Sequence, residues 1–570
     1  MACAFTVKIE DMSSTLPTRK ISNKITAALF VLTGLIVLGY AISAWIVGPS
    51  MYADQGMGFL AFEAWKHGGP FNTVPVPDPA NIALERGFFV AWWSPGQYLV
   101  PGLFQAMGFD LGHAMTITLA LCAVIALVGL YLLYSQWGFP PLSIAVTLLL
   151  LVSTRLFSHQ FDIYGGGEVL ITALTPWFLL LLFRLRDFTP LQAAVLLVAI
   201  VVLTVAKLSG LVFGIASIGA VGLLDLWSAR PKELQGPVLG VGLVTTTIKL
   251  VMRDLRLGFR GKILNIGIAL AVFAVLFQIF WLSRGETPTT AAANVFSPGK
   301  LLTHSIPAFV ACFTSILSIG DFSAATLMHP GHVIFQQRYP FYLIVALPVG
   351  VLAYVVGRQI ARSHPDYFRF AATLTIVFWL VMTVVYVRGG EVTLEDRHFR
   401  QIGMVLAIGI VHAVLNWRRL PAFAMAGLAL VLCAYGGASY LVKLRANTHA
   451  AKGGMGFRHL VLSPSGLDFI RTRLNTPPGG NALVVVPSAE IELEFTTRRT
   501  MEIAVDFMEP SDLRTRLSFR GRVDSLGVLI QTKMIDNGKA AMVLASFKDY
   551  PTDGWTRTPL GDFTYFSQGR

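Results

Sequence analysis

The stretch ITAALFVLTGLIVLGYAISAWIVGPSMYAD, residues 25–54, decides the fold of this chain. Its first part, 25–47, is an apolar run, and about 20 such residues are enough for a helix to cross a bilayer. The stretch ends at Asp54, a carboxylate that lies a few residues beyond the point where the predicted helix leaves the membrane. The loop that follows, 48–101, is rich in aromatic residues and closes on Trp92-Trp-Ser-Pro-Gly96. Because most connections span about 4–6 residues, a loop of this length predicts a functional site.

The composition indicates an integral membrane protein. The 570 residues are 54% hydrophobic and 14% charged, with a mean hydropathy of +0.63, whereas soluble domains carry about 25% charged residues. The net charge of +13 is expected in cytoplasmic loops, and we do not interpret it as nucleic-acid binding. Residues 1–24 are polar and basic without a cleavage motif, which predicts a cytoplasmic segment before a retained helix. The four cysteines have no spacing typical of a disulfide framework or a zinc site.

Apolar run lengths predict a polytopic α-helical membrane protein with about eleven spanning helices between residues 25 and 442. Two further apolar stretches, 97–108 and 306–320, are too short or too broken to span and are expected to be re-entrant or interfacial. The predicted spans are 25–47, 113–135, 140–157, 168–184, 190–206, 209–227, 263–283, 339–357, 370–387, 402–416 and 421–442.

The distribution of Lys and Arg predicts the orientation. Loops on the same side as the N-terminus are about 2.5-fold denser in these residues, the bias typical of cytoplasmic loops. An odd number of spans then places residues 443–570 on the extracytoplasmic side of the membrane. The chain is predicted to be an integral protein of the cytoplasmic (inner) membrane. On the inner side, the segment 237–262 mixes bases with apolar residues, a pattern typical of a helix on an anionic membrane surface.

Residues 443–570 differ in character from the rest of the chain, because Gly, Pro and charged residues become common and no run is long enough to span. The segments 483–487 and 526–530 are predicted to be buried strands, and 466–474 is predicted to be a helix. We therefore predict a small extracytoplasmic α/β domain in which the two strands share one sheet and the helix packs on it.

Asp54 is the first candidate for chemistry. At the outer membrane surface it would act as a general base or a metal ligand. The alternative is a loop aspartate that caps a helix starting near Gln55. The same loop carries Glu63 and Lys66, whose spacing indicates a solvated ion pair.

The second outer loop contains two carboxylates, Asp162 and Glu168, on either side of Gly165-Gly-Gly167. Such a turn allows close approach of a ligand, and the pair could hold a divalent cation together with substrate oxygens. The alternative is a plain turn with Glu168 as an acidic residue in the first turn of the next helix.

The most charged outer loop runs from Arg388 to Arg400 and enters a predicted span directly. It can bind phosphate through arginine, which contacts phosphate bidentately, and contact with lipid headgroups is the alternative. His329 and His332 form a weaker His-x-x-His pattern that favours a polar turn over a metal site. The chain contains no P-loop and no Gly-x-Ser-x-Gly elbow. The candidate binding residues of the charged loop are Glu391, Asp396, Arg397, His398 and Arg400.

Together these features resemble the GT-C superfamily of membrane glycosyltransferases, which includes protein O-mannosyltransferases and the aminoarabinose transferase of lipid A. The resemblance rests on an acid just after the first helix, the long first loop ending in Ser94-Pro-Gly96, and the late motif Asp396-Arg397-His398. It implies that Asp54 is the catalytic base or a metal-linked acid. It also implies that Asp396-Arg397-His398, where His replaces the more usual Tyr, holds the donor phosphate. Gln55 stands where the mannosyltransferases carry a second acid.

The resemblance implies an inverting transfer of a sugar from a polyprenyl-phosphate donor to a lipid, glycan or protein acceptor at the outer membrane face. The candidate cofactor is a divalent cation, Mg²⁺ or Mn²⁺, with Asp54 and Asp162 as its ligands if one is bound. Membrane lipids are expected partners and nucleic acid is not. A transporter or flippase for a lipid-linked or small polar substrate is the alternative, with Lys207 between two apolar runs as its best residue.

Overall fold

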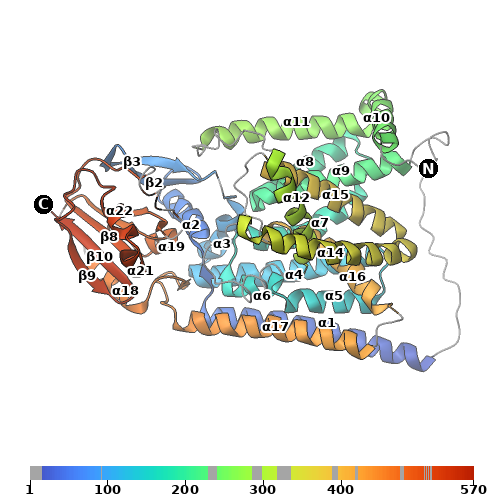
Figure 1. Cartoon of the computed structure of the whole chain (residues 1–570), viewed down its shortest axis with the longest axis horizontal. Coiled ribbons are helices and arrows are strands. Elements are labelled where there is room, and N and C mark those ends of the chain that lie inside the picture. Colours follow the sequence, from blue (N-terminus) through green and yellow to red (C-terminus); the bar gives the residue numbers. More distant parts are fainter. Residues whose placement is uncertain are drawn as a thin grey trace.

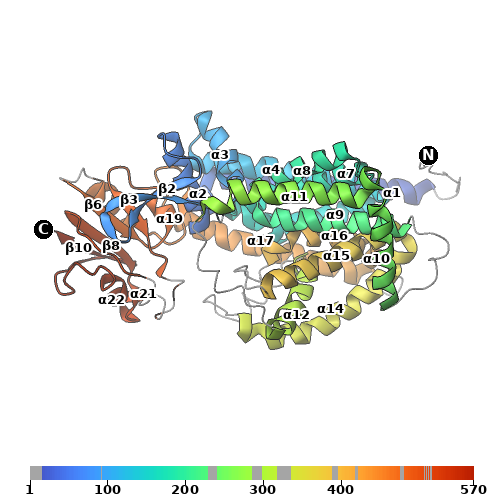
Figure 2. The same cartoon turned by 90° about the horizontal axis from the view of Figure 1, so that it is seen from above.

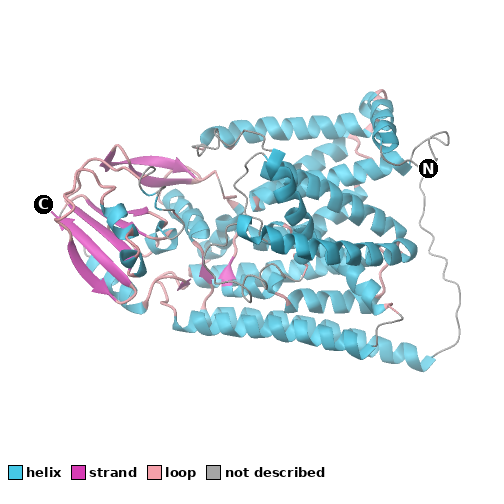
Figure 3. Ribbon diagram, viewed as in Figure 1, coloured by secondary structure: helices cyan, strands magenta, loops and turns pink. Residues whose placement is uncertain are grey.

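The computed structural model describes residues 16–91, 93–228, 241–285, 298–316, 335–387, 396–417, 422–475 and 480–569, the last range with gaps at 506–507, 509, 511–512 and 514–516. The long helices run along the longest axis of the molecule, and most strands gather at one end, where the C-terminus lies (Figure 1, Figure 3). The view turned by 90° shows the same division into a helical bundle and a strand-rich end (Figure 2).

The bundle makes the chain a polytopic helical membrane protein. Eight helical segments in the described ranges are long and apolar enough to cross a membrane, and they match eight of the predicted spans. The predicted spans 190–206 and 402–416 form shorter apolar helices, and 421–442 lies within a longer helix, so a total of eleven spans stays a prediction. The eight segments are Asn23–Val47, Leu111–Gln136, Pro141–Asp162, Gly167–Arg184, Leu208–Ser228, Lys262–Arg284, Ile344–Ser363 and Pro365–Val385.

Two helix ends differ from the prediction, because a helix needs apolar residues only where it crosses the membrane. The first helix begins at Leu16 rather than at residue 25, with a proline in its first turn, where proline is tolerated. The last helix of the bundle runs to His449, beyond the predicted boundary at 442. The helices of the bundle are α1 (Leu16–Val47), α4 (Leu111–Gln136), α5 (Pro141–Ser153), α6 (Arg155–Asp162), α7 (Gly167–Arg184), α8 (Pro190–Ala206), α9 (Leu208–Ser228), α10 (Val241–Leu255), α11 (Lys262–Phe280), α12 (Pro298–Thr314), α14 (Phe335–Ser363), α15 (Pro365–Val387), α16 (Arg400–Leu415) and α17 (Ala422–His449).

The first loop is folded throughout its described residues. It forms α2 (Ala53–Lys66), a hairpin of β2 (Thr73–Asp78) and β3 (Asn81–Phe89), and α3 (Gly96–Ala106), which is short as expected for 97–108. Before α2, the two-residue strand β1 (Ser50–Met51) pairs in parallel with β4 (Ile163–Tyr164) and with β5 (Arg458–His459). We call these three strands the junction sheet, because they join the first loop, the second loop and the C-terminal region.

The strand-rich end, which we call the α/β unit, contains a five-stranded sheet of order β7-β6-β8-β10-β9. β6 and β8 pair in parallel, which confirms the prediction that 483–487 and 526–530 share one sheet. The predicted helix 466–474 consists of α18 (Pro464–Phe469) and a π-helical turn, and Leu467 packs with Val484 and Leu529 of the sheet. The other elements are β6 (Ala482–Val486), α19 (Ala489–Glu492), β7 (Arg499–Glu502), β8 (Ser525–Gln531), α21 (Lys533–Asp536), α22 (Lys539–Leu544), β9 (Thr556–Leu560) and β10 (Phe563–Gly569).

The hairpin of the first loop reaches into the α/β unit. Ile82 is fully buried in the hydrophobic core of that unit, and its amide donates to the carbonyl of Arg520 at 2.8 Å. Glu85 forms an ion pair with Arg499 at 2.7 Å. The first loop and the α/β unit are therefore one packed structure, although 25–442 and 443–570 were predicted as separate domains.

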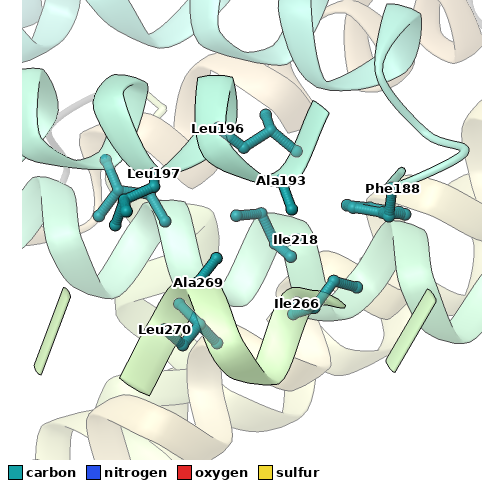
Figure 4. Close-up of a pocket in the computed structure, with 9 residues that line it drawn as sticks. Phe188, Ala193, Leu196, Leu197, Ile218, Ile266, Ala269 and Leu270 are labelled. Atoms are coloured by element: carbon teal, nitrogen blue, oxygen red, sulfur yellow. The ribbon is translucent and has the colours of Figure 1, made fainter. Parts of the chain in front are cut away.

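An apolar crevice lies between α8, α9 and α11 (Figure 4). It is narrow and partly open to the outside of the bundle. Because its lining is wholly apolar, it offers no group for proton transfer or for binding charge, and the chemistry has to be sought at the polar end of the bundle. The lining includes Phe188, Ala193, Leu196, Ile218, Ile266 and Leu270.

Candidate active site beside the junction sheet

The junction sheet brings distant segments to the end of the bundle that faces the α/β unit (Figure 3). β1 precedes α2, which carries Asp54, and β4 lies between Asp162 and Glu168. The sheet is reinforced at the carbonyl of Asp162, which accepts hydrogen bonds from Ser50 Oγ at 3.0 Å and from Asn447 Nδ2 at 2.8 Å. The backbones of the first and second loops are therefore held in a fixed relation.

Asp54 lies in the first turn of α2, but it is not the capping residue, because the N-cap is Tyr52. The capping interpretation is therefore wrong. The Asp54 carboxylate is instead hydrogen-bonded by the side chain of Trp93, at the end of the first loop. Burial raises the pKa of Asp54, while the nearby Arg397 and the Trp93 hydrogen bond act against the rise. A carboxylate whose pKa is raised by burial accepts a proton more readily than an exposed aspartate does.

Glu168 lies among three cationic side chains from two different segments, the turn between α8 and α9 and the start of α16. Its Oε1 is 3.0 Å from Lys207 Nζ and 3.6 Å from one terminal nitrogen of Arg397, and its Oε2 is 3.0 Å from a terminal nitrogen of Arg400. The Glu168 side chain is 11% exposed and that of Arg400 is 4% exposed. We call Glu168, Lys207, Arg397 and Arg400 the cation cluster.

The glycines before Glu168 make this cluster possible. Gly166 has φ of +58° and ψ of −119°, a backbone conformation that side chains disfavour. A Cβ on Gly167 would lie 2.3 Å from the carbonyl oxygen of Ala206, so only glycine lets α7 begin against the turn that carries Lys207. The sequence predicted that the triple glycine allows close approach of a ligand, whereas the contact seen at Gly167 is with the chain itself, at this turn.

Arg397 and His398 lie in a 3-10 turn, Asp396–His398, just before α16 begins at Arg400. Phe399, which lies between this turn and Arg400, is fully buried and anchors the turn in the core. Burial, together with the nearby Lys207 and Arg397, holds the pKa of His398 well below its usual value, so His398 is neutral at pH 7. Glu391 lies outside the described residues, as do His329 and His332, and the side chain of Asp396 is also outside them.

Asp162 has other charged neighbours than Glu168 has. It is 1% exposed, and its nearest charged neighbours are Lys443 and Arg155. Lys443 Nζ lies 2.7 Å from His159 Nδ1, so the polar surroundings of Asp162 belong to α6 and α17. Glu168 thus contacts Lys207, Arg397 and Arg400, whereas Asp162 lies beside Lys443 and Arg155, and these surroundings do not favour a cation shared by the two carboxylates.

The side chains available as metal ligands also bear on whether the predicted divalent cation could bind here. Within the part of the chain that the structure describes, no three His, Cys, Asp or Glu side chains form a group that could hold a metal ion. Asp54 and Asp162 in particular have separate surroundings. These residues do not fit the predicted cation site, and we derive no reaction step through a metal ion.

The α/β unit adds carboxylates that the sequence interpretation missed. Its helix α19 packs against α2, and a Cβ on Gly56 would lie 2.4 Å from the amide nitrogen of Glu490. Glu490 and Glu502 both lie close enough to Asp54 to interact with it electrostatically. Burial raises the pKa of Glu490, and it raises the pKa of Glu502 to about 8, with the neighbouring Glu492 and Glu490 adding to that rise.

The residues gathered here are thus only partly those predicted. Asp54, Glu168, Arg397 and Arg400 come together as expected. Lys207 joins them, and its place between two apolar runs was the signal that could have found it. Trp93 and Glu490 were missed because nothing in their local sequence links them to Asp54.

No protein-family model matches the sequence, and no curated protein sequence matches it. Among solved structures, the chain is similar to ArnT from Cupriavidus metallidurans bound to undecaprenyl phosphate, with a TM-score of 0.45, 12% identity, and coverage of 94% of this chain and 97% of ArnT. The apo structure of the same protein gives a TM-score of 0.41 at 11% identity. Arabinofuranosyltransferase AftD from Mycobacteria gives 0.41 at 12% identity, and the chain spans 41% of its length.

Proposed function

We propose that this protein transfers a sugar from a polyprenyl-phosphate donor to the hydroxyl of a lipid, glycan or protein acceptor at the outer face of the cytoplasmic membrane, with inversion at the anomeric carbon. The active site in this proposal is the space between Asp54 and the cation cluster. The proposal rests on the pairing of a proton acceptor with a phosphate-binding group at the end of an apolar bundle.

The observation that carries the proposal is the convergence of three basic side chains beside Asp54. Lys207, Arg397 and Arg400 meet at Glu168, and all four side chains are mostly or partly buried. Because attraction between opposite charges is stronger away from water, basic groups gathered in this way favour the binding of an anionic ligand. A phosphate supplies that anion, and arginine binds it with strong charge-assisted hydrogen bonds.

The chemistry follows from the two sides of the site. Asp54 takes the proton of the acceptor hydroxyl as the acceptor oxygen forms its bond to the anomeric carbon. The bond between that carbon and the phosphate oxygen breaks on the opposite face, and the polyprenyl phosphate leaves with the electron pair. Positive groups placed where this charge develops stabilise the transition state more than the ground state.

Glu168 has a supporting role in this scheme. It holds the three cationic side chains together before the donor arrives, which avoids mutual repulsion among them. Glu168 also interacts electrostatically with Asp54. A negative charge near Asp54 also favours its protonated form, and this increases its basicity.

The test is sugar transfer from radiolabelled polyprenyl-phosphate donors in proteoliposomes, with wild type compared with Asp54→Asn. We expect the variant to lose turnover and to keep donor binding, because asparagine preserves the shape but cannot take a proton. Glu63→Gln, on the exposed side of the same helix, is the matched control and should keep full turnover. Undiminished transfer by Asp54→Asn would contradict the assignment of Asp54 as the base.

One observation also favours the alternative of a transporter or flippase. The ion pair of Lys207 and Glu168 lies at the ends of apolar helices, and ionisable groups in such places often line a transport path. The same proteoliposomes separate the two functions, because a transporter would move labelled lipid between leaflets without forming a glycosylated product.

A further inference from the structure

Helix α10 crosses the end of the bundle that lies opposite the α/β unit (Figure 1, Figure 2). It runs across the direction of the spanning helices and packs against α9 and α11. A helix in this position lies along the membrane surface rather than through it.

Nine described side chains of α10 and of Arg256, the residue that follows it, form three stripes with helical spacing. One stripe is buried against the bundle, a second is apolar and exposed, and a third is basic and exposed. In this order the stripes are Thr246, Leu250 and Asp254; Ile248, Met252 and Leu255; and Lys249, Arg253 and Arg256. The apolar stripe is 37–56% exposed, which is unusual for large apolar side chains beside water.

The single acid of this region is withdrawn from the surface. Asp254 is 8% exposed, and its Oδ2 accepts a hydrogen bond from the amide of Ile263 at 2.7 Å, near the start of α11. The exposed part of α10 therefore carries bases without a compensating acid. The turn after α10 continues the pattern with Phe259, which is 65% exposed, and with the exposed Arg260.

An apolar stripe beside a basic stripe fits the boundary between acyl chains and headgroups of a bilayer. The apolar side chains enter the acyl boundary, and the bases meet lipid phosphates, whose attraction grows with the anionic charge of the lipid. A water-soluble acidic partner would match the basic stripe but would leave the apolar stripe in water. Both stripes together favour a lipid surface.

We propose that residues 245–260 form a binding surface for anionic phospholipids in the leaflet at this end of the bundle. This surface lies at the opposite end of the molecule from the cation cluster, and the proposal does not depend on the reaction assigned to that cluster.

The experiment titrates the purified full-length protein in detergent with phosphatidylglycerol or phosphatidylcholine and counts bound lipids by native mass spectrometry. We expect wild type to bind phosphatidylglycerol at least tenfold more tightly than phosphatidylcholine. The variant K249Q/R253Q/R256Q/R260Q should lose at least tenfold in affinity for phosphatidylglycerol and keep its affinity for phosphatidylcholine. If the quadruple variant does not fold, the double variants K249Q/R253Q and R256Q/R260Q replace it. Each should bind phosphatidylglycerol more weakly than wild type, with a smaller loss of affinity than the quadruple variant.

The matched control removes four exposed bases from the α/β unit, R520Q/K533Q/K548Q/R557Q, and should bind phosphatidylglycerol like wild type. Equal affinities of wild type and the α10 variant for phosphatidylglycerol would overturn the proposal, as would an equal loss in the control. Inorganic phosphate serves as a soluble competitor. Release of the lipid by millimolar phosphate would show a general anion site rather than a lipid surface and would also overturn the proposal.

Discussion

Replacing Arg397 with glutamine separates the proposed chemistry from the stability of the fold. Arg397 lies 3.6 Å from Glu168 and its side chain is 30% exposed, so loss of this ion pair should cost less than about 1 kcal/mol. Arg400 is 3.0 Å from the same carboxylate and 4% exposed, so Arg400→Gln should cost about 3 kcal/mol. We therefore expect the melting temperature to fall clearly for Arg400→Gln and little for Arg397→Gln.

The effect of Arg397→Gln on the reaction should be much larger than its effect on stability. Loss of charge-assisted hydrogen bonds to the donor phosphate should cost about 1.5–3 kcal/mol, or about 10–150-fold in kcat/KM. The pH profile should also move. Arg397 now lowers the pKa of Asp54, so its removal raises that pKa, and the acidic limb of kcat/KM shifts to higher pH.

The assay is the initial rate of sugar transfer from polyprenyl-phosphate donors across a pH series, with thermal unfolding of the same preparations. Arg369→Gln, whose side chain is 67% exposed, is the control and should match wild type in both measurements. A fall in kcat/KM below about threefold, with an unmoved acidic limb, would refute the placement of Arg397 at the reaction centre.

Three further outcomes are expected. Gly56→Ala should lower both melting temperature and turnover by separating α2 from Glu490, at a cost of about 1–3 kcal/mol, whereas Gly34→Ala, with no atom within 4 Å of its Cβ, should do neither. Burial raises the pKa of Glu502 to about 8, so its contribution to stability is fully present below about pH 4.3 and is lost as pH rises through about 8. Glu502→Gln should therefore raise the melting temperature more at about pH 8.5 than at about pH 5, and an equal gain at both would contradict the shift. A reporter fused after His449 should be active on the periplasmic or extracellular side, and a cytoplasmic signal there would reverse the orientation and the face assigned to the site.

The helices and the sheet were predictable because their signals are local. Apolar run length located the spans, and short buried apolar runs located the strands 483–487 and 526–530. Helix ends were less predictable, because the polar residues at the N-terminus of α1 and the C-terminus of α17 continue helices past the membrane. Nothing in local periodicity marks such extensions.

The site was predictable in part. A charged loop beside a span indicated Arg397 and Arg400. The triple glycine was interpreted as room for a ligand, whereas Gly167 packs against the turn that carries Lys207. The charged neighbours of Asp162 could not be predicted, because proximity in sequence to Glu168 does not determine which other segments pack around it. Glu490 could not be found at all, since its relation to Asp54 exists only through the packing of α19 on α2.

The junction sheet also sets an order of events during synthesis. Its central strand, β1, can pair with β5 only after β5 has been synthesised, about four hundred residues later. The side chain of Arg458, for example, donates a hydrogen bond to the carbonyl of Val47, which lies 411 positions earlier. At about 5–20 residues per second, translation of that interval takes on the order of 20–80 seconds. Throughout it the first loop lacks one edge of its sheet and the core that receives Ile82. The nascent chain is thus a membrane-inserted but incomplete protein until its last quarter arrives, and a ribosome that stalls before β5 leaves Asp54 on a loop without its final support.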